Sequence, residues 1–244
     1  MGLIFNGKSS RDFGLIISKY PPLNHGVKRG EAYTIAGRNG TFYREDGTYD
    51  NYIQPYEVAI REKNRRADLR AADVAAWLLG SSGFCRLEDT FEPEYFKMAR
   101  YAGALNIEQI LGKYGKATLE FDCQPERWLK NGEDVQTLIA GVNTIYNPTA
   151  FKAKPLIKMY GGGSMVLSVN DTEYFSVYET AESWCCVIDC ETGEITDDDG
   201  VSKIASTTFY TRYNDFPVLE SGINTFEFDS NTDTIEIIPR WWTL

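Results

Sequence analysis

Few side chains in this sequence have the type and spacing that catalysis requires. His25 is the single histidine among 244 residues, and it stands in the loop sequence Pro-Pro-Leu-Asn-His-Gly. A Ser-His-Asp hydrolase, a histidine-rich zinc site or an HExxH protease needs histidine at a defined spacing from its partner residues. His25 alone could still act as an acid or base, but its surroundings favour a solvated loop histidine.

The segment from Gly2 to Ser9 matches the sequence pattern of a phosphate-binding loop. It reads Gly-Leu-Ile-Phe-Asn-Gly-Lys-Ser, which satisfies the pattern G-x-x-x-x-G-K-[ST]. A phosphate loop follows a strand and opens a helix, whereas Met1 alone precedes Gly2 and another glycine, Gly14, follows soon after. Because Asn-Gly is the strongest short hairpin signal, Asn6-Gly7 predicts a β-hairpin and no nucleotide site.

Two clusters contain side chains that can bind metal ions, but neither has a suitable arrangement. Cys185, Cys186 and Cys190 stand close together, yet neighbouring residues on a strand point to opposite faces. The five cysteines form no CxxC pair. The residues at the start of the sequence do not have the pattern of a secretory signal, so we expect reduced thiols that pack as small apolar groups. The run 197–200, Asp-Asp-Asp-Gly, lacks the closing glutamate of a calcium loop and predicts a solvated acidic turn.

Four arginines at helical spacing form the candidate subunit interface that the sequence offers. They are Arg61, Arg65, Arg66 and Arg70. Guanidinium groups bind phosphates or the carboxylates of a neighbouring subunit. Glu62 lies four residues before Arg66, so the pattern favours a solvated helix face with local ion pairs, and a subunit interface comes next. We predict no catalytic residue, no cofactor and no metal, and therefore no enzyme.

Carbohydrate binding is the alternative function. Trp184, Trp241 and Trp242 have aromatic faces of the kind that stack on sugar rings, although packing in a core or an interface accounts for them better. A glycosidase would need two carboxylates across a cleft, and no pair among the 35 acidic residues stands out.

The elements that position these residues are mainly strands. Asn6-Gly7 and Asn39-Gly40 predict hairpins. The alanine-rich, proline-free run from Asn64 to Leu79 predicts one helix that stops at Gly80, with an apolar stripe of Leu69, Ala72, Ala76 and Leu79. A short helix is expected at 132–142. Strands are expected at 13–17, 32–35, 41–44, 52–61, 84–87, 94–101 and 116–123.

The chain changes character near residue 147. Short strands separated by turn signals follow, which is typical of a β-sandwich; they are expected at 155–160, 165–170, 172–178, 184–190, 206–212, 225–228 and 234–238. Residues 1–146 hold 19 Lys+Arg and 19 Asp+Glu, whereas residues 147–244 hold 6 and 16. We therefore predict two domains, 1–146 and 147–244, and expect the acidic one to repel nucleic acid.

The composition is that of a globular protein, with 43% hydrophobic and 25% charged residues. The sequence contains no apolar run of about 20 residues, the length that spans a bilayer. We expect no membrane partner and no specific nucleic-acid binding.

The ordered set of short motifs resembles the distal tail (Dit) proteins of long-tailed, non-contractile phages and prophages of Gram-positive bacteria. The resemblance covers nearly the whole chain, although Ala36 stands where the family pattern has proline before Gly37. The segments that carry it are FNGKSSRDFGLIIS, IAGRNGTFYREDGTYDNYIQPYEVAI, AAWLLGSSGFCRLEDTFEPEYFKMARY, NPTAFKAKPLIKMYGGGSMVLSVN and FPVLESGINTFEFDSNTDTIEIIPRWWTL.

This resemblance implies a fold and a structural role. The expected fold is an N-terminal β-sandwich-like domain with one helix, followed by a galectin-like β-sandwich. The expected role is that of a virion component at the tail tip or baseplate, made in the host cytoplasm and active in host adsorption. It would form a homohexameric ring through residues 1–146. The implied partners are the tail tube protein, a tail-associated fibre or lysin protein, and receptor-binding proteins.

Overall fold

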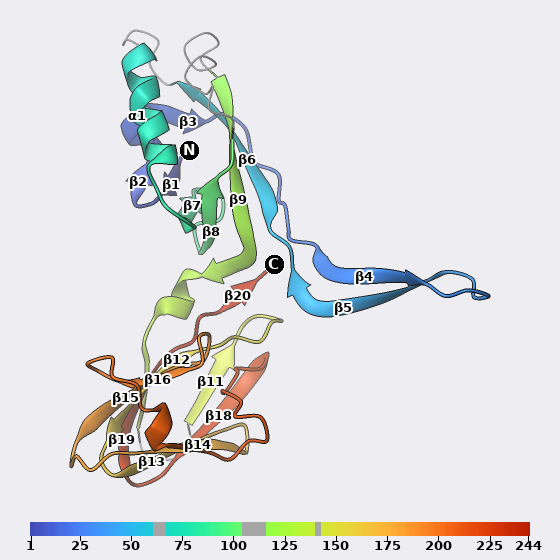
Figure 1. Cartoon of the computed structure of the whole chain (residues 1–244). Coiled ribbons are helices and arrows are strands. Elements are labelled where there is room, and N and C mark those ends of the chain that lie inside the picture. Colours follow the sequence, from blue (N-terminus) through green and yellow to red (C-terminus); the bar gives the residue numbers. More distant parts are fainter. Residues whose placement is uncertain (61–66, 104–115, 140–142) are drawn as a thin grey trace. The chain divides into compact units, whose positions relative to one another are not determined.

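The computed structural model describes residues 1–60, 67–103, 116–139 and 143–244, and these divide into two compact units (Figure 1). Unit 1 is Met1–Arg127 with Leu244, and unit 2 is Trp128–Thr243. The described residues are mainly β with one α-helix, which confirms the predicted fold class. The division falls before residue 147, because strands at 136–139 and 143–147 pair within unit 2.

Unit 1 is built on one large antiparallel sheet. Its strand order is β2-β1-β7-β8-β9-β6-β3, and β20 also pairs with β9. The strands are β1 (Leu3–Phe5), β2 (Lys8–Ser9), β3 (Leu15–Ile17), β6 (Tyr52–Ile60), β7 (Cys85–Asp89), β8 (Tyr95–Tyr101) and β9 (Lys116–Leu129), whereas β20 (Trp242–Thr243) belongs to unit 2. A short 3₁₀ helix, Ser10–Phe13, links β2 to β3. Two further strands, β4 (Lys28–Thr34) and β5 (Thr41–Tyr49), form a separate two-stranded sheet.

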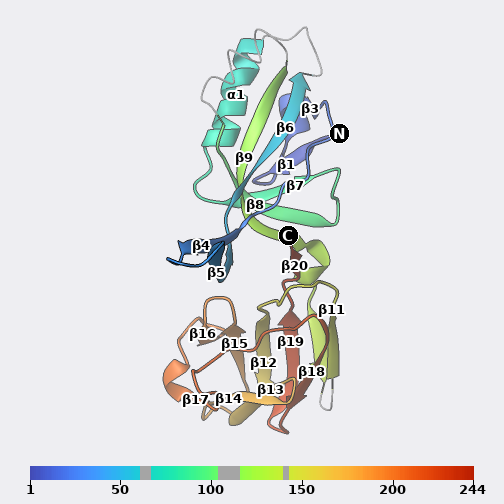
Figure 2. The ribbon, with the colours of Figure 1, turned by 90° about the vertical axis from the view of Figure 1, so that its right-hand side faces the viewer.

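The helix α1 (Ala67–Leu79) lies beside the large sheet, as Figures 1 and 2 both show. It buries Val74, Trp77 and Leu78, which are spaced i, i+3 and i+4. The predicted apolar stripe is therefore wrong at its described positions, since the side chains of Ala72, Ala76 and Leu79 are exposed. Larger side chains at the same helical spacing bury more apolar area than alanines do, so they define the inner face.

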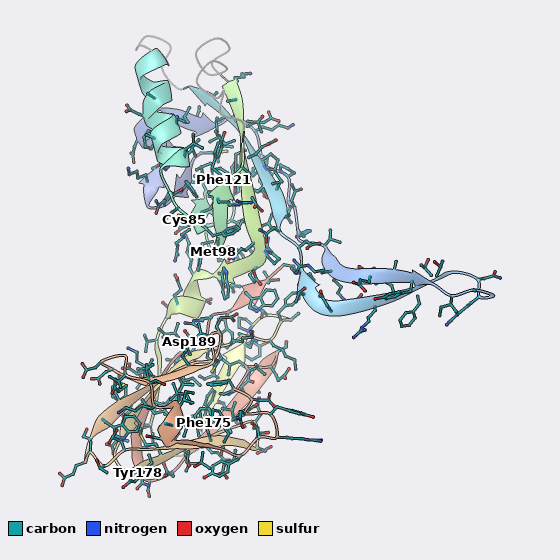
Figure 3. The ribbon with its side chains drawn as sticks, viewed as in Figure 1. Cys85, Met98, Phe121, Phe175, Tyr178 and Asp189 are labelled. Atoms are coloured by element: carbon teal, nitrogen blue, oxygen red, sulfur yellow. The ribbon has the colours of Figure 1, made fainter. Side chains whose placement is uncertain are left out.

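Aromatic rings fill the core of unit 1. The Trp77 ring stacks on Phe13 with centroids 4.6 Å apart, and its Nε1 donates to the Phe5 carbonyl at 2.9 Å. Phe121 of β9, labelled in Figure 3, lies 5.1 Å from the Phe5 ring and makes an edge contact with Tyr56. Gly80 donates to the Ala76 carbonyl, and α1 ends at Leu79 as predicted.

Unit 2 is a sandwich of two five-stranded antiparallel sheets, which confirms the β-sandwich expected there. One sheet has the order β10-β19-β12-β15-β16 and the other β11-β18-β13-β14-β17. The strands are β10 (Gln136–Ile139), β11 (Asn143–Asn147), β12 (Leu156–Gly161), β13 (Ser164–Val169), β14 (Thr172–Tyr178), β15 (Trp184–Asp189), β16 (Glu194–Asp197), β17 (Thr207–Phe209), β18 (Gly222–Phe228) and β19 (Thr232–Ile238). Short 3₁₀ helices occur at Lys130–Glu133 and Ile204–Ser206.

The helix expected at 132–142 is wrong where the structure describes that segment. After the 3₁₀ turn, residues Gln136–Ile139 form β10 and pair with β19. Leu138 is buried while Thr137 and Ile139 are exposed, which is the period of two expected for a strand. Pairing with β19 and burial of Leu138 outweigh the weak local preference for helix in this segment.

Candidate functional site

The β4–β5 pair, here called the ribbon, is the most exposed regular structure in the described chain. Among its sixteen strand residues, Gly30 and Tyr49 are partly covered and the others are exposed. No third strand pairs with it among the described residues. A two-stranded ribbon without a covered face is marginally stable in water, so we expect another molecule to cover it.

The ribbon carries large apolar side chains on both faces. Tyr33 and Phe42 are direct cross-strand partners and are 41% and 53% exposed. On the opposite face the Tyr43 ring lies over Gly30, where an added Cβ would come within 2.8 Å of that ring. Tyrosine and phenylalanine are enriched at protein interfaces. The ribbon therefore has the composition of a contact surface.

The base of the ribbon lies close to β9 at one point and carries two exposed ion pairs between its own residues. Gly26 lies so close to the Asp50 carbonyl and Pro125 that a Cβ would approach them to 2.4 and 2.8 Å. Asp50 also pairs with Arg29 at 2.9 Å. Glu45 accepts a hydrogen bond from Lys28, which raises the pKa of that ammonium group. The two ion pairs support the pairing of β4 with β5 near the base of the ribbon.

A shallow pocket of about 510 Å³ lies elsewhere on unit 1. Its apolar lining comes from Tyr20, Pro21, Pro22, Leu23 and Pro55, and Lys19 and Glu57 form an ion pair at its rim. Tyr20 and Leu23 are largely exposed. The pocket has apolar walls and few polar groups, so it suits an apolar side chain better than a polar substrate.

The predicted arginine interface falls mostly outside the described residues. Arg61, Arg65 and Arg66 lie in the undescribed segment, and Arg70 lies in α1 with its side chain not described. The sequence did not single out the ribbon aromatics. The hairpin predicted from Asn39-Gly40 is present, but its loop spans residues 35–40 and is longer than a two-residue Asn-Gly turn. The apolar residues of the hairpin looked like those of an ordinary half-buried strand.

The segment Gly2–Ser9 is a hairpin, as predicted. Phe5 pairs with Lys8 and Ile4 with Ser9, and Asn6 and Gly7 both have positive φ, at 49° and 73°. The chain then enters a short 3₁₀ helix, which Ser9 and Asp12 cap reciprocally. The strand and α-helix that flank a phosphate loop are missing from this described segment.

The other residues whose side chains could act in catalysis or bind a metal ion have structural partners or lie in solvent. His25 is exposed. All five cysteines are free, and burial raises the pKa of the Cys123 and Cys186 thiols to about 12. Cys186 faces the core, whereas Cys185 contacts Tyr160 on the other side of the sheet. Among the described residues, no group of three or more His, Cys, Asp or Glu side chains is placed to hold a metal ion.

The acidic turn and the tryptophans also have structural roles. Asp197 pairs with Lys203 and accepts the Val201 N–H, which lowers the pKa of its carboxyl. Trp241 is buried, and Trp242 packs on Phe151 with ring centroids 4.5 Å apart. Trp184 packs against the core of unit 2. The buried Trp241 is not available to a sugar, and the partly buried Trp184 and Trp242 each use part of their surface in packing.

In the described part of the chain, no helix has the length and apolar character needed to cross a membrane.

No protein-family model and no curated protein matches the sequence. The structure, however, is similar to the crystal structure of the SPP1 Dit protein (gp 19.1), which is described as a paradigm of the hub adsorption apparatus in phages that infect Gram-positive bacteria. The TM-score is 0.76, and the match covers 100% of this chain and 99% of that chain. The chain has a Dit-like fold. Sequence identity to SPP1 Dit is 14%, so this likeness concerns the fold alone.

Proposed function

We propose that this protein is a structural hub of a phage tail tip and works through protein–protein contacts rather than catalysis. It would join the tail tube to the tail-associated fibre or lysin protein and to receptor-binding proteins. One finding that supports this proposal is the structural similarity to a hub adsorption protein over the whole chain. The observation on which the proposal mainly rests is the exposed ribbon, because its uncovered apolar side chains favour contact with another protein.

In this proposal the ribbon is the contact between successive copies in a homohexameric ring. A ring needs a head-to-tail contact, in which one surface of a subunit meets a different surface of the next. The ribbon and the pocket beside Tyr20 and Pro55 are two such surfaces on the same unit. We propose that Phe42 and Tyr33 of one copy enter this pocket of the next copy.

The charge distribution supports a ring made by unit 1. Unit 1 contains 18 Lys+Arg and 17 Asp+Glu, whereas unit 2 contains 7 and 18. Six strongly acidic units packed against one another would repel, and nearly neutral ones would not. The acidic units would then lie outside the ring, free to meet other proteins of the tail tip.

The test is the oligomeric state of ribbon variants. Phe42→Glu should give monomers under conditions where the unchanged protein forms hexamers, alone at high concentration or with the tail tube protein. Tyr213→Glu is the matched control, because it places the same charge on an aromatic position of unit 2 that is 74% exposed. Analytical ultracentrifugation distinguishes the two, and hexamers of Phe42→Glu as abundant as those of the control would refute the proposal.

The arginine set remains a further prediction for this contact. Charge reversal at Arg65 and Arg66 should weaken the oligomer while leaving the fold intact. A ring that closes through unit 2, with unit 1 outside, would contradict both contacts. The protein would lie in the host cytoplasm before assembly and at the tail tip in the virion.

A further inference from the structure

The sheet β11-β18-β13-β14-β17 of unit 2 has an unusual charge pattern. Its five strands contain only two charged residues, Glu173 and Glu227, and no lysine or arginine. Serine, threonine and tyrosine occupy many of the positions that alternate with the buried core residues. We call the outward side of this sheet the hydroxyl face, defined by Tyr146, Ser168, Glu173, Tyr178, Ile223 and Glu227.

The two carboxylates lie in one row across the middle of the hydroxyl face. Ser168 pairs with Glu227 on one side and with Glu173 on the other. Within the described part of the chain, neither carboxylate makes an ion pair or a side-chain hydrogen bond. The face therefore presents two negative charges with no internal counter-charge.

Most cations of unit 2 are paired with other carboxylates. Lys152 pairs with Glu220 at 2.6 Å, and Lys154 with Glu191 at 3.4 Å. Lys203 contacts both Glu179 and Asp197, and Arg240 contacts Asp189. Glu173 and Glu227 thus lie apart from the places where the unit neutralises its own charge.

Large apolar and aromatic side chains flank these carboxylates. Tyr146 and Ile223 are direct cross-strand partners and are 66% and 71% exposed. Tyr178, labelled in Figure 3, is also exposed at the end of β14, and the Tyr210 hydroxyl lies 3.0 Å from Ser176 Oγ. Exposed tyrosines among small hydroxyl side chains are the composition of many protein-recognition surfaces.

We propose that the hydroxyl face docks a basic protein surface, with arginine or lysine side chains meeting Glu173 and Glu227. Carboxylates covered by a partner need counter-charges, and guanidinium groups supply them with charge-assisted hydrogen bonds. The excess of acid in unit 2 repels nucleic acid and acidic proteins, and attracts a basic partner. This goes beyond the hub proposal, because it names the partner chemistry of unit 2 and does not depend on the ribbon.

The test uses the full chain and a peptide of nine arginines as the probe, measured by titration calorimetry. The double variant E173Q/E227Q should bind the peptide about fivefold more weakly than the unchanged protein. The matched control is E182Q/D233N, which removes the same charge from exposed positions of unit 2 outside the hydroxyl face. It should change affinity less than about twofold, and circular dichroism should show both variants folded.

Three outcomes would overturn the proposal. Equal losses in the two double variants would mean that the peptide senses only the net charge of unit 2. If the unchanged protein shows no measurable binding of the peptide at low salt, the hydroxyl face does not bind basic partners. Binding of a neutral oligosaccharide such as chitohexaose that Tyr146→Ala abolishes, with peptide affinity unchanged by E173Q/E227Q, would assign the face to carbohydrate. Because Phe42→Glu tests assembly on unit 1, failure here leaves the hub proposal standing.

Discussion

Arg240 binds Asp189 through two parallel hydrogen bonds, from Nη1 to Oδ1 at 2.7 Å and from Nη2 to Oδ2 at 2.9 Å. The pair ties the segment that follows β19 to the end of β15, where Figure 3 labels Asp189. Asp189 Oδ1 also accepts the Glu191 and Thr192 N–H groups. Arg240 has a φ of 59°, a conformation that a non-glycine residue adopts at some cost, so the ion pair helps to hold a strained backbone.

Arg240→Ala should destabilise unit 2 by about 1–3 kcal/mol at neutral pH, because it removes two charge-assisted hydrogen bonds from a half-buried carboxylate. The Arg240 guanidinium holds the pKa of Asp189 below its ordinary value. A depressed pKa contributes stability that is fully present above the unfolded-state pKa of about 3.9, and this contribution is lost progressively as pH falls from there through the lower folded-state pKa. Urea unfolding at pH 7, 5, 4 and 3 should therefore show the difference between variant and unchanged protein shrinking with acid. A difference independent of pH would contradict the assigned role of the pair.

Trp77→Phe should destabilise unit 1 by about 1–3 kcal/mol, because it removes the buried hydrogen bond from Trp77 Nε1 to the Phe5 carbonyl. The Trp77 side chain is buried, and its Nε1–H donates directly to that carbonyl. Trp242→Phe is the matched control, since Trp242 Nε1 donates to the Lys152 carbonyl at 2.8 Å in an exposed setting. Water replaces the lost donor there, so its cost should be smaller. Each variant is compared with the unchanged protein in the urea unfolding of its own unit. Equal losses of unfolding free energy in the two variants would contradict this account.

The thiols should differ sharply in reactivity. Cys123 and Cys186 are buried with pKa values of about 12, and burial also raises the pKa of Cys185 and Cys190. The thiolate is the reactive form, so these four should resist Ellman's reagent at pH 8 in the folded protein. Cys85, which is half-buried, should react first. Cys85→Ser should remove the fast phase, and denaturant should expose the remaining thiols; a fast phase that survives Cys85→Ser would refute the assignment.

Local turn chemistry explains why much of the fold was predictable from the sequence. Asn6-Gly7 has the positive φ values that a tight hairpin needs, and the alternating strands of unit 2 match their expected positions closely, as at Thr172–Tyr178. The inner face of α1 was mispredicted because the helix has two apolar stripes at helical spacing: the alanine stripe and a second one that contains Val74 and Trp77. Which stripe is buried depends on the shape of the sheet below it.

The candidate sites were harder to predict because exposure is a property of the fold. Phe42 and Tyr33 lie within sequences that are typical of strands. These sequences do not distinguish a strand in a core from a strand in an uncovered ribbon. The row of Glu227, Ser168 and Glu173 needs the pairing of β13 with the distant strand β18 and the register shift after Leu167 that brings Glu173 opposite Ser168. The tryptophans invited a sugar-binding hypothesis, and their packing could be seen only after the chain was folded.

The boundary between the units gives the last prediction. The charge break suggested a cut before residue 147, but the structure begins unit 2 at Trp128. A fragment 128–244 should fold alone with a cooperative urea transition, since it keeps β10 against β19 and β11 against β18. A fragment 147–244 loses the buried side chains of Leu138 and Ile145, and it should be less stable by more than about 3 kcal/mol or not fold at all. Amide spectra and urea midpoints of the two fragments make the comparison, and equal stability would place the boundary at residue 147 after all.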